Sequence, residues 1–146
     1  MYKKILVPLD GSELAEAVLP HAQALAKSEG AEIVILRVPE LPAADLFTRN
    51  PAMAKKIVED SEIETDKYLK AEVKKLSGKG VTVSSLIREG PVPETILTAA
   101  KEAHADVIAM STHGRTGLQR WLMGSVADRV VHYSKIPVML IHPSPN

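Results

Sequence analysis

Short runs of consecutive apolar residues recur along this chain, and stretches with helical periodicity separate them. The runs cover residues 5–7, 33–36, 81–87, 107–110 and 138–141. All except the third are continuous rather than alternating, which is typical of strands that helices cover on both faces of a parallel sheet. The alternation of strands and helices predicts an α/β fold with a doubly wound parallel sheet.

Four helices are predicted between the runs. They follow Ser12, extend from Asn50-Pro51 to about Gly78, begin at residues 91–93, and extend from Ser125 to about Ser134. Pro20 is expected to kink the first, because proline removes a backbone donor and crowds the preceding turn. The long second helix is expected to turn Ile57 and Leu69 inward. Residues 39–50 lack clear periodicity and are predicted to form a loop or lid.

The composition fits one domain over residues 1–146. Eighteen basic residues balance 18 acidic ones, which argues against broad binding to nucleic acid or to an anionic membrane. The chain has no cysteine, so it can form neither a disulfide nor a thiolate zinc site. Residues 1–4 do not resemble a signal peptide, and no apolar run approaches the ~20 residues of a membrane span, so a cytoplasmic location is expected.

The ends of the first two strands carry possible ligand contacts. Asp10 follows the first strand, where a carboxylate suits a ribose hydroxyl or a hydrated cation. The alternative is that residues 10–12 form only a turn and a helix cap. Free backbone groups near Val38, after the second strand, could contact the edge of a base. The alternative there is a strand that simply ends at Pro39.

The segment after the fourth strand is the most informative. Ser111, Gly114 and Gly117 are small at positions where a backbone bends and approaches a ligand closely. Gly124-Ser125 opens a helix, and the first N–H groups of a helix form a ready anion site. The sequence therefore favours a phosphate chain as the ligand.

Charge supports the same interpretation. Four cations and one acid lie between Ser111 and Lys135, a local charge of +3 in a neutral chain: Arg115, Arg120, Arg129, Lys135 and Asp128. The alternatives are that Ser125 and Asp128 form only a capping box, that the arginines are solvated, and that His113 is an ordinary loop histidine. The loop matches neither the P-loop nor the dinucleotide-binding pattern.

Taken in order, these segments resemble the ATP-binding branch of the universal stress protein family, from residues 3–12 to residues 136–141. That branch carries G-x-x-G, nine residues and then G-[ST]. Here Gly114 is the second glycine and Gly124-Ser125 close the motif, whereas Ser111 replaces the first glycine. The resemblance implies a five-stranded, Rossmann-like parallel sheet in the order 3-2-1-4-5.

The resemblance also implies roles for individual residues. Pro8, Asp10 and Val38 would surround adenine and ribose. The ribose and phosphates would be wrapped by Ser111, Thr112, His113, Gly114, Arg115, Thr116 and Gly117. The β- and γ-phosphates would be held by Gly124, Ser125, Val126 and Ala127. A Mg²⁺ or Mn²⁺ could sit on the phosphates near Asp10, without a direct protein ligand.

The family usually forms homodimers through its last strand, which implies pairing through Val138, Met139, Leu140 and Ile141. An apolar edge strand in a monomer invites such pairing. The alternative is that the neighbouring prolines protect this edge.

Three functions remain open from the sequence. The first is an ATP-binding regulatory protein with little or no catalysis. The second is a slow ATPase or autophosphorylating protein, in which His113 or Asp10 would orient water and Thr112 or Ser125 would accept phosphate. The third is a scaffold or partner-binding module without nucleotide, if Ser111 has broken the site.

Overall fold

Five parallel strands lie in the order β3-β2-β1-β4-β5 in the computed structural model, which describes residues 1–113 and 123–143. The strands are β1 (Lys4–Pro8), β2 (Glu32–Arg37), β3 (Val83–Ile87), β4 (Val107–Ser111) and β5 (Val138–Ile141). The helices are α1 (Glu13–Glu16), α2 (Leu19–Glu29), α3 (Ala44–Arg49), α4 (Pro51–Ser77), α5 (Val92–Glu102) and α6 (Ser125–Tyr133). The predicted fold class and strand order are confirmed.

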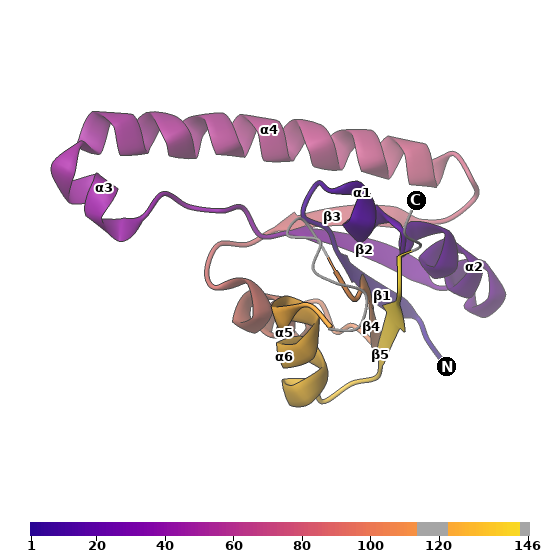
Figure 1. Cartoon of the computed structure of the whole chain (residues 1–146). Coiled ribbons are helices and arrows are strands. Elements are labelled where there is room, and N and C mark those ends of the chain that lie inside the picture. The colour runs from indigo at the N-terminus through magenta and orange to yellow at the C-terminus, as the bar shows by residue number, and fades with distance from the viewer. Residues whose placement is uncertain (114–122, 144–146) are drawn as a thin grey trace.

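Helices cover both faces of the sheet (Figure 1). Along β1, Ile5 and Val7 pack on the side of α1, α2 and the second half of α4. Leu6, between them, packs on the side of α5 and α6. Because successive strand residues point to opposite faces, a strand buried on both sides needs consecutive apolar residues. This double burial explains the continuous apolar runs in the sequence.

Two helical predictions are wrong in detail. The helix expected to kink at Pro20 is two helices, α1 and α2, and Pro20 lies in the first turn of α2. A missing N–H costs nothing there, because the first turn has no internal acceptor for it. Residues 44–49, predicted to be irregular, form α3.

The long helix α4 begins and ends close to where the sequence indicated. The Asn50 side chain accepts a hydrogen bond from the backbone N–H of Met53, and the helix ends at Ser77, before Gly78. However, Ile57 is 37% exposed rather than buried, whereas Leu69 is 2% exposed. In Figure 1, α3 and the first part of α4 extend past the strands. No helix in the described part of the chain has the length and apolar character needed to cross a membrane.

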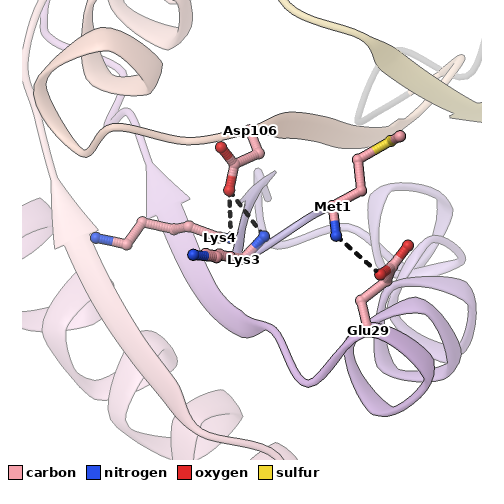
Figure 2. Close-up of polar contacts among 5 residues, drawn as sticks. All are labelled: Met1, Lys3, Lys4, Glu29 and Asp106. Atoms are coloured by element: carbon pink, nitrogen blue, oxygen red, sulfur yellow. Dashed lines mark hydrogen bonds and ion pairs between the residues drawn. The ribbon is translucent and has the colours of Figure 1, made fainter.

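The Asp106 carboxylate holds the start of β1 in place through two backbone hydrogen bonds. Asp106 precedes β4, and its Oδ2 accepts hydrogen bonds from the backbone N–H groups of Lys3 (2.8 Å) and Lys4 (2.9 Å), as Figure 2 shows. The same view shows the amino group of Met1 beside Glu29, 3.3 Å away. The two backbone hydrogen bonds hold the pKa of Asp106 below its ordinary value of 3.8.

We expect Asp106→Asn to remove an acid-sensitive part of the stability. Because the pKa of Asp106 is lower in the folded chain, the stabilisation is complete above pH 3.8 and is lost as the pH falls through the folded value. The wild type should therefore melt at a higher temperature than the variant at pH 7, and the difference should shrink in acid. Thermal melts from pH 7 to pH 2.5 measure this. Asp45→Asn on α3 is the matched change of charge, and an equal response of both variants would contradict the assignment.

Candidate functional site

A cavity opens at the carboxyl ends of β1, β2 and β4. It lies where the strand order reverses, between β1 and β4, the place where open α/β sheets bind ligands. All the predicted site residues that the structure describes line it: Pro8, Asp10, Val38, Ser111, Thr112, His113, Gly124, Ser125, Val126 and Ala127. The other predicted contacts, Gly114, Arg115, Thr116 and Gly117, lie outside the described residues.

Part of the lining was missed by the sequence analysis. The additional residues are Leu9, Ala15, Leu36, Arg37, Glu40, Val92, Ile96 and Met110. Leu36 and Met110 are buried near the ends of β2 and β4, and Ile96 reaches the cavity from α5. Their position next to the strand ends could have indicated them. However, apolar residues at such positions look the same in the sequence whether they line a cavity or only fill the core. Together they give the cavity an apolar wall.

Asp10 is both a turn residue and a cavity residue. Its Oδ1 accepts hydrogen bonds from the backbone N–H of Ser12 (2.9 Å) and from the Ser12 hydroxyl (2.6 Å). The Ser12 oxygen in turn accepts from the backbone N–H of Ala15 and caps α1. The turn-and-cap alternative is therefore correct for the local structure. It does not compete with a ligand role, because Asp10 also lines the cavity.

The end of β2 presents backbone groups to the same cavity. Leu36 accepts a hydrogen bond from the N–H of Leu9 (2.8 Å), and Arg37 accepts one from the N–H of Arg88 (3.3 Å). Val38 is the next residue and lines the cavity. Among the described residues, no backbone hydrogen bond engages Val38. Its peptide groups can therefore contact a ligand.

The start of α6 approaches β4 very closely. Gly124 is the N-cap, and its N–H donates to the carbonyl of Thr112 (2.8 Å). A Cβ on Gly124 would lie 2.7 Å from that same carbonyl oxygen, so only glycine fits without a shift of backbone. Ser125 is the first helical residue, and in the described part of the chain no side-chain hydrogen bond caps this end of the helix. The capping-box alternative for Ser125 and Asp128 is therefore wrong, and the first amides of α6 border the cavity.

The described cations contribute less to the site than their positions in the sequence indicated. Arg129 Nη2 lies 2.7 Å from Oε1 of Glu94 on α5. Neither Arg129 nor Lys135 lines the cavity, and Arg115 and Arg120 lie outside the described residues. In the part of the chain that the structure describes, no three His, Cys, Asp or Glu side chains gather to hold a metal ion.

Three polar residues are buried at the end of β4: Ser111, Thr112 and His113. The Thr112 Oγ1 lies 3.1 Å from Nδ1 of His113 and 3.3 Å from Nδ1 of His142. His142 directly follows β5, and the pairing of Ser111 with Ile141 in the sheet brings it there. The Nε2 of His113 and the Oγ of Ser111 are buried, and neither has a hydrogen-bond partner among the residues that the structure describes.

Arg37 connects the cavity to α4. The side chain of Arg37 is 6% exposed, pairs with Glu64 (3.4 Å) and lies over the ring of Tyr68. The Tyr68 hydroxyl donates to Oε2 of Glu16 (2.6 Å), and burial together with this hydrogen bond raises the pKa of Tyr68 well above its ordinary value. Burial also raises the pKa of Glu72, one turn further along α4. The contacts among Arg37, Tyr68 and Glu16 therefore connect α1 and α4 to the end of β2.

The universal stress protein family matches this chain over residues 1–142. The chain belongs to that family. Universal stress protein MJ0577 of Methanocaldococcus jannaschii is 34% identical, over 97% of this chain and 95% of the relative.

Solved structures agree with this assignment. The structure of MJ0577, described as a hypothetical protein, superposes with a TM-score of 0.88 at 29% identity, over 100% and 99% of the two chains. A universal stress protein in complex with cAMP has a TM-score of 0.69 at 20% identity, over 98% of each chain. One from Archaeoglobus fulgidus in complex with dAMP has a TM-score of 0.69 at 23% identity, over 96% of this universal stress protein and 98% of that chain.

Proposed function

We propose that this universal stress protein binds ATP in the cavity between β1 and β4 and acts as a nucleotide-dependent regulatory protein with little or no catalysis. The observation that carries the proposal is the start of α6. Its N-cap is a glycine without a side-chain cap, and Gly124, Ser125, Val126 and Ala127 all border the cavity. Uncapped amides at a helix N-terminus attract phosphate oxygens.

The rest of the lining suits the other parts of a nucleotide. Leu36, Ile96 and Met110 give an apolar wall on which a base can pack. The Val38 backbone can contact the edge of that base, and the Asp10 carboxylate can accept hydrogen bonds from ribose hydroxyls. The phosphates then extend toward α6. A Mg²⁺ or Mn²⁺ would bind mainly through phosphate oxygens and water, with Asp10 in the same cavity.

Two structural neighbours were solved with adenine nucleotides, one with cAMP and one with dAMP. Their identity to this chain is 20% and 23%, so the likeness is one of fold. It supports adenine nucleotides as the ligand class to test first.

Autophosphorylation of Thr112 is the second candidate, favoured by the contact of its hydroxyl with the His113 imidazole. Such a pair could in principle activate the hydroxyl. However, Thr112 is 1% exposed and its oxygen also contacts His142. A hydroxyl held on two sides is poorly placed for in-line attack on a phosphate. Autophosphorylation at Thr112 is therefore less well supported than nucleotide binding without it.

Calorimetric titration with ATP, ADP and AMP tests the proposal. We expect one site per chain and tighter binding of ATP than of AMP, because the α6 amides contact the additional phosphates. Phosphate release should be slow or undetectable in the same preparation. An absence of both heat and thermal shift at millimolar ATP would contradict nucleotide binding and favour the scaffold alternative.

We also propose that two copies pair through β5, the edge strand of the sheet. The carbonyl of Pro137 accepts a hydrogen bond from the N–H of Ile108 in β4, and the carbonyl of Ile141 accepts one from Thr112, just after β4. The backbone groups of Val138 and Leu140 therefore point away from β4. A second β5 can pair with these groups about a two-fold axis. Sedimentation equilibrium at micromolar protein should give twice the mass of the single chain, and the mass of one chain alone would contradict this pairing.

A further inference from the structure

The hydroxyl of Thr112 is shared by two histidines and has only one proton. It can donate to one ring and accept from the other. If it accepted from both rings, its own proton would need a third partner, and none is found among the described residues. Because Thr112 is 1% exposed, leaving that proton unpaired is costly. The two rings therefore take opposite roles toward the hydroxyl.

Which of the two rings donates to the Thr112 hydroxyl decides whether Nε2 of His113 is a hydrogen-bond donor or an acceptor toward the cavity. When Thr112 donates to Nδ1 of His113, the neutral ring carries its proton on Nε2. When Nδ1 of His113 donates to Thr112, a neutral ring leaves Nε2 bare. The Nε2 atom is buried and has no hydrogen-bond partner within residues 1–113 and 123–143. His113 is 7% exposed and lines the cavity. The first arrangement supplies an N–H donor there, and the second supplies an acceptor.

The neighbourhood of His113 favours a donor. The Cα of His113 would lie 3.7 Å from a Cβ on Gly124, so the residue stands beside the N-terminus of α6. A phosphate group at those amides has only acceptor oxygens when fully ionised. An N–H on Nε2 would bind it, whereas a bare nitrogen would repel it.

We propose that His142 is a positioning residue that fixes the proton of His113. This proposal rests on the proposed binding of nucleotide phosphate in the cavity. In the arrangement that we propose, Nδ1–H of His142 donates to Oγ1 of Thr112, and the Thr112 hydroxyl donates to Nδ1 of His113. The Nε2–H of His113 then donates to a phosphate oxygen of the bound nucleotide. His142 is exposed, so its other ring nitrogen can exchange hydrogen bonds with water during this arrangement.

Nitrogen NMR of the full chain with ¹⁵N-labelled histidine reads the proton positions directly. In the ATP complex we expect neutral His113 with its proton on Nε2 and an unprotonated Nδ1. His142→Phe keeps a ring but removes the donor, so it should disturb this pattern and weaken ATP binding about two- to tenfold, the factor that matches the net worth of one hydrogen bond. His142→Asn restores an N–H donor near Nδ1 and should recover most of the affinity. His132 is an exposed histidine on α6 outside the cavity. His132→Phe is the control and should change neither the His113 signals nor the ATP affinity.

The outcomes separate this proposal from the proposed function. The three hydrogen bonds from His142 through Thr112 and His113 to the phosphate are called the relay here. If the wild type binds no ATP, nucleotide binding itself is overturned, and the relay with it. If ATP binds but His113 carries a proton on Nδ1, alone or together with Nε2, the relay is overturned while the proposed function stands. Equal affinity and equal His113 signals in the wild type and His142→Phe also overturn the relay alone. Because His142 is exposed and follows the last strand, the variant should keep its fold, which the melting temperature verifies.

Discussion

Gly124→Ala is expected to impair both the fold around the cavity and ATP binding. The new Cβ would lie 2.7 Å from the carbonyl oxygen of Thr112, a backbone atom that cannot swing aside. The start of α6 must then move away from β4, at a cost in stability of about 1–3 kcal/mol for such overpacking. The same movement displaces the amides proposed to hold phosphate. Losing one hydrogen bond to a charged oxygen weakens binding by roughly tenfold or more.

Gly78→Ala is the matched control for this substitution. Gly78 has φ −64°, and its added Cβ would meet its nearest backbone atom at 3.6 Å, an ordinary contact. Its melting temperature should equal or slightly exceed that of the wild type, because alanine reduces the freedom of the unfolded chain. Denaturant unfolding and ATP titration measure both variants. Wild-type affinity in folded Gly124→Ala would show that the α6 amides do not bind the nucleotide.

Leu69→Ala is expected to have the largest effect on stability. Leu69 is 2% exposed and joins α4 to the core formed with α2 and the sheet. Removing a buried leucine side chain leaves a cavity and costs about 2–5 kcal/mol. Urea unfolding should show a lower midpoint with little change in slope.

Ile63→Ala on the same helix separates burial from helix propensity. Ile63 is 69% exposed, so its truncation should change the free energy of unfolding by only about 0.5 kcal/mol or less. Both substitutions place alanine in α4 and both remove an aliphatic side chain. Equal losses of stability in the two variants would contradict the packing of α4 described above.

The apolar pattern was enough to predict the sheet, because a strand buried on both faces admits few polar residues. Residues 33–36 show this most clearly, and they are buried throughout in β2. Helix boundaries were equally readable where a cap is local, as at Asn50. The strand order, the family and the role of each site residue were expected from the resemblance. The family and the strand order are established, whereas the binding roles remain predictions.

Other features depend on contacts between distant segments and leave no local signal. Ile57 has the same apolar character as Leu69, but only the second half of α4 lies on the sheet. The formation of α3 has no such explanation, because none of its residues is buried.

The sequence by itself determined the class of fold and the edge of the sheet where the cavity lies, because hydrophobic periodicity and strand ends are local properties. Only the tertiary structure decided that Gly124 touches the carbonyl of Thr112 and that His142 reaches the same residue. The physical reason is register. The pairing of β4 with β5 brings together residues 30 positions apart, and no local pattern encodes that alignment.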